Sequence, residues 1–600
     1  MTETATAIAE AVSSGTTRAE TVANATLARI AAYAAIQPAV WIHRLPEADV
    51  LAMARAVDAR IAAGEILPLA GVPFAIKDNI DLAGAPTTAG CPDFAYDPAR
   101  SAGVVARLIA AGAVPVGKTN LDQFATGLNG SRSPYGAPAC VFNRAYVSGG
   151  SSSGSAVAVA AGLVPISLGT DTAGSGRVPA AFNGLIGFKP TKGRWSTAGL
   201  VPACRSIDCI TVFAHDAADA ALVDAVVAGH DGDDPWSREK ADRALTLSRV
   251  GVPLPHQRQF FGDATSERLY GQALDRLVAM GAELVDIDLA PLSEAARLLY
   301  DGPWVAERTA AIAEFLANHP DSIDPTVRTI VEGGLGRSAV EVFRGIYRLA
   351  ELKQQADALW GEIDALCLPT APTIYRLAEM RAAPIALNSN LGLYTNFVNL
   401  LDMAAIAVPA GWRGNDTGFG VTLIGPAWSD RALIAMAARW CAGDPYPHPP
   451  LDLEAKVETV HLAVVGAHLE GMPLHWQLTS RNARHVATTT TAPSYRLYAM
   501  ADSVPPKPAL IHDATGAAIA VEVYALDMAA FGSFVAEVPA PLAIGTVTLA
   551  DGSTVKGFVA EPRAIIGATD ITDLGGWRVF IASKACLSRI ERRVLRFACR

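Results

Sequence analysis

The stretch from Gly149 to Thr191, GGSSSGSAVAVAAGLVPISLGTDTAGSGRVPAAFNGLIGFKPT, holds two glycine- and serine-rich clusters on either side of an apolar run. In the first cluster, Gly149–Gly154, glycines permit backbone angles that other residues avoid and let main-chain N–H groups approach a ligand. The run Ser155–Leu163 predicts a fully buried helix, which Pro165 limits. The second cluster, Thr170–Gly176, places another serine among consecutive N–H donors. Serines of the two clusters could therefore meet in one pocket.

The position of the histidines restricts the chemistry that such serines could perform. A serine hydroxyl is a poor nucleophile unless a base takes its proton, and that base is most often histidine. No histidine occurs between His43 and His215, whereas Lys77 ends the short apolar segment GVPFAIK at 71–77. Burial lowers the pKa of a lysine, so a neutral amine can act as the base. A site built from a lysine and serines is the most economical interpretation.

Three segments resemble the amidase signature family: GVPFAIKD at 71–78, GGSSSGS at 149–155 and GTDTAGSGRVPAAFNGLIGFKPT at 169–191. The resemblance implies an α/β fold with a central mixed β-sheet covered by helices. It also implies that Lys77 is the general base, that Ser151 is a bridging serine after a cis peptide bond, and that Ser175 is the nucleophile that forms an acyl-enzyme.

The same resemblance implies an oxyanion hole made by the backbone N–H groups of Thr172, Ala173, Gly174 and Ser175. Ala173 departs from the pattern, because many family members have two glycines at 173–174. An alanine keeps its N–H but needs an ordinary φ angle.

Other interpretations of the glycine-rich segments are weaker. The cluster at 149–154 could be a linker or a phosphate cradle, but no Gly-Lys-Ser/Thr follows it. The segment Gly112–Thr119, GAVPVGKT, fits the spacing of a P-loop, yet a strand-like Val-Pro-Val fills the interior where a loop is needed. We interpret that match as accidental.

Composition and charge limit the classes of binding partner that the protein could have. The chain has 600 residues, 51% of them hydrophobic, and a formal net charge of -10. This charge argues against a general nucleic-acid or anionic-membrane binder and favours small-molecule or protein partners. The eight cysteines show no metal-ligand spacing and are typical of reduced thiols in a cytoplasmic protein. No secretory signal or transmembrane segment is evident, and no metal, nucleotide or organic cofactor is implied.

Periodicity predicts the organisation of the first part of the chain. Residues 5–65 show helical periodicity, and Leu69–Ile76 predicts a strand that ends at Lys77. The segment Asp122–Gly136 has loop chemistry, and the resemblance implies that it lines the substrate pocket near Gly127. Prolines cluster at 445–450, so we expect the catalytic domain to span residues 1–450.

The remainder of the chain predicts a second, mainly β domain at 457–584, resembling a small barrel. Strand-like segments recur along it, and Asp551-Gly552 lies between two of them, which is typical of a tight hairpin. Residues 585–600 form a basic tail with Arg589, Arg592 and Arg593 among its charges. This tail is either a partner-binding helix or a solvated end.

The C-terminal part of the chain makes the resemblance more specific, because it resembles the allophanate hydrolases. The segments VGAHL at 465–469, TAP at 491–493, YRLY at 495–498 and GGWR at 575–578 carry it. Tyr300 and Arg308 match positions that hold the substrate's carbonyl and carboxylate oxygens in that family. A guanidinium can bind a carboxylate bidentately, which suits a small anionic amide. The resemblance thus implies hydrolysis of allophanate to ammonia and carbon dioxide, with N-carboxycarbamate as intermediate.

Several alternatives stay open at this stage. The chain could be another small-amide amidase or an amidotransferase-type subunit, or a binding protein on an inactive scaffold. The second domain could break down N-carboxycarbamate, with His468 or His485 as a base, or it could serve oligomerisation or contact with a urea carboxylase. We also expect a homo-oligomer, specifically a homodimer. Whether the substrate arises from urea carboxylation or from triazine or biuret breakdown is left open.

Overall fold

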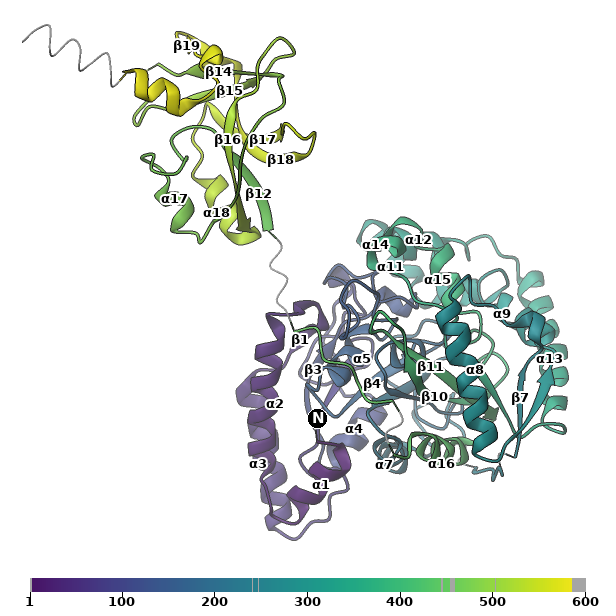
Figure 1. Ribbon diagram of the computed structural model, residues 1–600. Coiled ribbons are helices and arrows are strands. Elements are labelled where there is room, and N and C mark those ends of the chain that lie inside the picture. Colours follow the sequence, from purple (N-terminus) through teal and green to yellow (C-terminus); the bar gives the residue numbers. More distant parts are fainter. Residues whose placement is uncertain are drawn as a thin grey trace, which may run out of the picture. The chain divides into compact units, whose positions relative to one another are not determined.

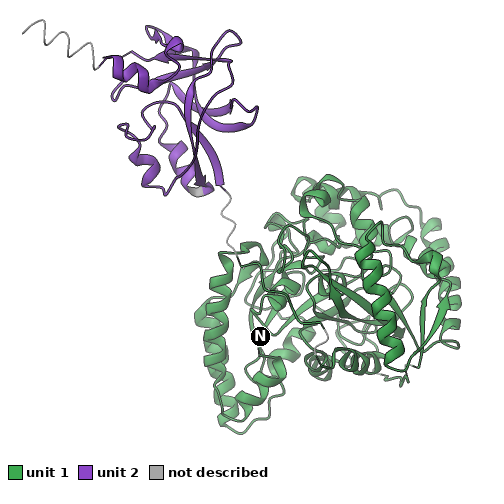
Figure 2. Ribbon diagram, in the orientation of Figure 1, with its two compact units in different colours: residues 1–454 green, residues 455–600 purple. Residues whose placement is uncertain are grey.

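The computed structural model describes residues 3–239, 241–246, 248–443, 446–453, 459–501 and 503–584. The chain divides into two compact units, Met1–Glu454 and Ala455–Arg600 (Figure 2). Each unit has its own hydrophobic core. Within the described residues, no helix is both long and apolar enough to cross a membrane. The predicted basic tail at 585–600 lies outside the described residues.

The described part of the first unit is built on one eleven-stranded sheet. In order across the sheet, the strands are β1 (Trp41–Arg44), β3 (Val114–Thr119), β2 (Pro73–Lys77), β4 (Ile166–Asp171), β6 (Cys209–Ala214), β5 (Ile186–Lys189), β10 (Met403–Trp412), β11 (Gly418–Pro426), β9 (Ala365–Pro369), β7 (Arg249–Pro253) and β8 (Glu283–Ile287). Parallel and antiparallel pairs are mixed, because β3, β2 and β4 run parallel while β4, β6, β5, β10, β11 and β9 alternate in direction. This confirms the mixed central sheet.

Helices cover both faces of the sheet, as the fully buried central strands require. They are α1 (Ala5–Ser13), α2 (Ala19–Ala34), α3 (Glu47–Ala62), α4 (Gly103–Ala110), α5 (Ser153–Ala160), α6 (Val178–Phe182), α7 (Ala217–Val227), α8 (Ala264–Ala279), α9 (Ala290–Arg297), α10 (Trp304–Ala311), α11 (Ala313–Asn318), α12 (Pro325–Glu332), α13 (Ala339–Leu359), α14 (Leu377–Ala382), α15 (Ala386–Leu391) and α16 (Asp430–Cys441). Figure 1 shows α2 and α3 side by side near the sheet edge formed by β1.

The predicted buried helix forms, but α5 begins at Ser153 and ends at Ala160, earlier at both ends than the predicted run Ser155–Leu163. All eight residues of α5 are buried, so this helix is enclosed by the sheet and its neighbours. Lys77 is the last residue of β2. One element was not predicted: residues 41–44 form β1, an antiparallel edge strand, within the region expected to be helical.

The second unit contains a five-stranded and a three-stranded sheet. Their strands are β12 (Thr459–Val464), β13 (Arg484–Thr490), β14 (Tyr495–Ala499), β15 (Pro508–His512), β16 (Ala520–Asp527), β17 (Leu542–Thr548), β18 (Thr554–Ala560) and β19 (Thr569–Asp570), with helices α17 (Trp476–Thr479) and α18 (Met528–Ala536). The edge strands β13 and β17 are joined at one end by a bridge between Thr491 and Leu549. The expected small barrel is therefore only partly closed.

Candidate active site

The predicted catalytic residues lie at one edge of the large sheet. Lys77 ends β2, and Asp171 ends the neighbouring parallel strand β4. The carboxyl ends of parallel strands meet at the same sheet edge, which is where α/β proteins commonly bind ligands. Ser151 precedes α5, and Ser175 lies in the turn between β4 and α6. The topology thus gathers residues that are far apart in the sequence.

Lys77 is fully buried between hydroxyl groups. Its Nζ lies 2.7 Å from Oγ of Ser151 and 2.6 Å from Oγ1 of Thr170. Among the described residues, no carboxylate forms an ion pair with it. Burial lowers the pKa of Lys77 to about 7, although nearby carboxylates oppose this shift. A substantial fraction of the amine is therefore neutral near pH 7, as a general base must be.

Ser151 connects to Lys77 in the expected manner. The peptide bond between Gly150 and Ser151 is cis, as the resemblance implied. The hydroxyl of Ser175 lies 3.4 Å from the carbonyl oxygen of Gly127 and donates to it. The hydrogen bonds of the described residues link Lys77 to Ser151 but include none between Ser151 and Ser175. The structure thus brings the amine and the first serine into direct contact, while the second serine hydroxyl points toward Gly127.

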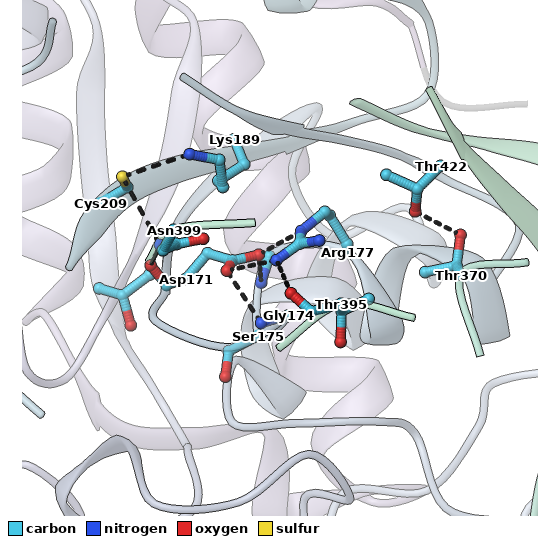
Figure 3. A network of polar contacts seen from close by, with 12 residues as sticks. Asp171, Gly174, Ser175, Arg177, Lys189, Cys209, Thr370, Thr395, Asn399 and Thr422 are labelled. Atoms are coloured by element: carbon cyan, nitrogen blue, oxygen red, sulfur yellow. Dashed lines mark hydrogen bonds and ion pairs between the residues drawn. The ribbon is translucent and has the colours of Figure 1, made fainter. Parts of the chain in front are cut away.

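The turn that carries Ser175 is held by a buried ion pair (Figure 3). The Asp171 carboxylate accepts bonds from the N–H groups of Gly174 at 2.9 Å and Gly176 at 3.1 Å. Arg177 binds the same carboxylate through two nitrogens, at 2.8 and 2.9 Å. Burial alone would raise the pKa of Asp171, but the guanidinium holds it below its usual range. This bidentate pair fixes the conformation of the turn.

These contacts correct one member of the predicted oxyanion hole. The N–H of Gly174 is engaged by Asp171, so this residue supports the turn instead of offering a free donor. The N–H groups of Thr172, Ala173 and Ser175 have no acceptor among the described residues. Ala173 does not have a positive φ angle, whereas Gly174 has a φ of 137°. An alanine at 173 is therefore compatible with the backbone.

Arg308 is a buried cation for which the described residues supply no counter-ion. Its side chain belongs to α10, the residue is 2% exposed, and no carboxylate pairs with it in the described part of the chain. Nη1 lies 3.3 Å from Oγ1 of Thr126, and the guanidinium carbon lies 5.1 Å from the ring centre of Tyr300. Its Nε is buried and finds no hydrogen-bond partner in the part of the chain that the structure describes. Burying a charge is costly unless it is paired, so this arrangement favours an anionic ligand.

The segment Thr126–Gly127 connects Arg308 to Ser175, the predicted nucleophile. Thr126 contacts Arg308 through its hydroxyl, and the next residue, Gly127, accepts the hydrogen bond of Ser175. The guanidinium and the Ser175 hydroxyl thus each contact one of two consecutive residues. Tyr300 and Arg308 are eight residues apart in the sequence. The structure brings these two predicted substrate-binding residues together, and Nη2 of Arg308 donates to the Tyr300 hydroxyl.

Sequence reasoning missed three buried polar residues of the site. The Thr170 hydroxyl is the second one bound to Lys77. Thr170 lies within the glycine- and serine-rich stretch at 149–191, so the motif could have indicated it. Asp208 accepts a hydrogen bond from the Thr172 hydroxyl, and Asn399 donates to the carbonyl oxygen of Asp171 at 2.7 Å. Both come from distant segments with no distinctive pattern.

The two candidate histidines of the second unit differ in their surroundings. His468 lines a cavity of about 240 Å³, together with Lys507 and Phe558, and its Nε2 lies 2.7 Å from Oε1 of Gln477. Burial lowers the pKa of His468. His485 lies on β13 and is exposed, with its Nε2 3.1 Å from Oγ1 of Thr488. The cavity singles out His468.

Comparison with known proteins agrees with the fold. The family model described as Amidase matches residues 23–434, and the chain belongs to this family. The model of the allophanate hydrolase C-terminal domain matches residues 460–582.

Individual relatives extend this match along most of the chain. The chain is 45% identical to the urea amidolyase of Saccharomyces cerevisiae over 86% of its own length and 30% of the relative. It is 44% identical to the urea amidolyase of Lachancea kluyveri, over 90% of this chain and 31% of that protein.

A solved structure of Kluyveromyces lactis allophanate hydrolase is similar with a TM-score of 0.66 and 43% identity, covering 91% of this chain and 94% of that one. The chain thus spans about a third of the urea amidolyases that it matches.

Proposed function

We propose that the first unit hydrolyses the terminal amide of allophanate, urea-1-carboxylate. The observation that carries this proposal is the buried guanidinium of Arg308, which pairs with no described carboxylate and lies beside the segment that contacts Ser175. Allophanate has a carboxylate for this cation and an amide carbonyl for the serine. A simple neutral amide would leave the buried charge without a partner, at a cost of several kcal/mol.

The chemistry starts with acyl transfer to Ser175. Neutral Lys77 takes a proton from Ser151, which in turn takes the proton of Ser175 as its oxygen attacks the terminal carbonyl carbon. The N–H groups of Thr172, Ala173 and Ser175 stabilise the negative oxygen. The carbon–nitrogen bond breaks, the relay protonates the leaving nitrogen, and ammonia departs. Water then attacks the acyl-enzyme through the same relay and releases N-carboxycarbamate.

We further propose that the second unit breaks down N-carboxycarbamate to ammonia and carbon dioxide. Gln477 donates to Oε2 of Glu537 over 3.2 Å, which orients its amide oxygen toward Nε2 of His468. That oxygen can only accept, so Nε2 carries the proton and Nδ1 is free to act as a base. Lys507 in the same cavity supplies positive charge for a dianion. We do not propose His485 as this base, since its side chain is exposed.

Ammonia release from purified protein tests the main proposal. The expected result is turnover of allophanate, with acetamide turned over at least about a hundredfold more slowly and biuret in between. Equal turnover of acetamide, or none of allophanate, contradicts it. A general amidase or an amidotransferase-type subunit would give one of those results.

Assembly and location remain predictions. We propose a urea carboxylase as a partner, because the chain resembles a part of the larger urea amidolyases. We also propose a homodimer, and a cytoplasmic location in line with the cysteine pattern. Light scattering of the purified chain tests the dimer. Co-purification with a separately expressed urea carboxylase tests the partner.

A further inference from the structure

The loop Ala203–Asp208, which precedes β6, contacts the turn that carries the nucleophile. The Asp208 carboxylate accepts a hydrogen bond from the hydroxyl of Thr172. It also accepts bonds from the N–H groups of Ala203 at 2.7 Å and Cys204 at 3.1 Å, which close the loop around it. Thr172 and Asp208 are both buried. The side chain of Thr172 is therefore fixed while its N–H has no acceptor among the described residues.

The same loop also contacts the helix that carries Arg308. The N–H and the hydroxyl of Ser206 each donate to the Glu307 carboxylate, both at 2.7 Å. Glu307 directly precedes Arg308 on α10. Two charge-assisted hydrogen bonds therefore tie the position of this helix turn to the loop.

Asn399 joins the loop and the turn a second time. Its Nδ2 donates to the carbonyl oxygens of Asp171 at 2.7 Å and Ile207 at 2.8 Å. Figure 3 shows this side chain beside Asp171. The end of β4 and the loop are thus connected independently of the Thr172–Asp208 contact.

We propose, resting on the function proposed above, that the loop Ala203–Asp208 couples carboxylate recognition at Arg308 to the oxyanion hole, with Asp208, Thr172 and Glu307 as positioning residues. A substrate carboxylate that draws Arg308 toward it shifts α10, and the loop transmits this shift to the N–H of Thr172. Displacements of a fraction of an ångström at an oxyanion donor change rates strongly, so small shifts suffice.

Thr172 offers a test that does not depend on the identity of the substrate. Thr172→Ser keeps the hydroxyl, and Thr172→Val removes it while keeping shape and N–H. The rate at which a fluorophosphonate probe labels Ser175 reads the nucleophile and the oxyanion hole directly. We expect Thr172→Val to slow labelling about tenfold or more and Thr172→Ser to retain most of it. Thr422→Val, which breaks a buried hydroxyl pair with Thr370, is the matched control and should label normally. Equal rates for the two Thr172 variants overturn the positioning role of this hydroxyl.

Glu307→Gln tests the coupling. Glu307 touches no reacting group. If it only held Arg308 in place for substrate binding, Glu307→Gln would raise the KM for allophanate and leave kcat unchanged. Coupling predicts that kcat also falls at least about threefold. It further predicts that Asp208→Asn lowers kcat much less in the Glu307→Gln variant than it does in the wild type. Glu332→Gln, on the neighbouring helix α12, is the control. A change in KM alone, or independent multiplication of the two losses, overturns the coupling. If the wild type does not turn over allophanate, the proposed function fails, while the labelling experiment still decides the role of Thr172.

Discussion

Lys77 and Arg308 are two buried cationic side chains in one site, yet their surroundings give them opposite roles. Both are almost inaccessible, both contact a threonine hydroxyl, and neither has an ion-pair partner among the described residues. Burial lowers the pKa of Lys77 to about 7, so its amine can lose the proton. A guanidinium stays charged under the same conditions. An unpaired buried amine is therefore suited to be a base, and an unpaired buried guanidinium to be an anion receptor.

The largest effect is expected at Ser175, the proposed nucleophile. Ser175→Ala removes the attacking oxygen and should lower kcat for ammonia release by about 10⁴-fold or more, with little change in folding. Ser389→Ala, on an exposed hydroxyl of α15, is the control. A Ser175→Ala variant that retains most of its turnover would falsify the acyl-enzyme mechanism.

Exchanging the amine for a guanidinium tests the comparison directly. Lys77→Arg keeps a positive charge but cannot accept a proton, so kcat should fall by about 10³-fold or more, as it should for Lys77→Met. Steady-state kinetics at pH 8 measure the loss. An active Lys77→Arg enzyme would mean that the residue acts through its charge.

Substitutions of Arg308 should have smaller effects than those of Lys77. Arg308→Met removes the receptor and should lower kcat/KM for allophanate by about 100-fold, which corresponds to a few kcal/mol. Arg308→Lys keeps the charge without the bidentate geometry and should lie between. Biuret has no carboxylate, so its turnover should change by less than about threefold. A similar loss for both substrates would indicate damage to the fold of α10 instead.

The smallest effect on the first step is expected from the second unit. His468→Ala should leave release of the first ammonia within about twofold of wild type, because the first unit has its own core and site. N-carboxycarbamate should accumulate, which ¹³C NMR of labelled allophanate can detect. His485→Ala is the matched control, since this histidine is exposed. Absence of accumulation favours a role of the second unit in assembly.

Much of the fold and the nucleophile region could be predicted from the sequence, because local patterns encode them. The apolar run at 155–163 and the strand ending at Lys77 follow from periodicity, and the family motif places Ser151 after a cis bond. The engaged N–H of Gly174 could not be foreseen, since it depends on where the Asp171 side chain points.

Other features depend on contacts between distant segments. Asp208 and Asn399 reach the site only after the sheet has formed, and nothing near them in the sequence marks their role. Strand β1 was missed because four residues at a sheet edge carry little periodicity. The partial closure of the second unit is set by where β13 and β17 end.

The pH dependence of kcat/KM for allophanate tests most directly whether Lys77 acts as a neutral base. Because the pKa of Lys77 is lowered to about 7, the rate should rise with pH from about 6.5 and level off above about 8, as the amine loses its proton. Arg308 stays charged throughout this range and adds no further limb. A rate that is independent of pH across this range, or one that still rises tenfold per unit at about pH 9, would contradict the account.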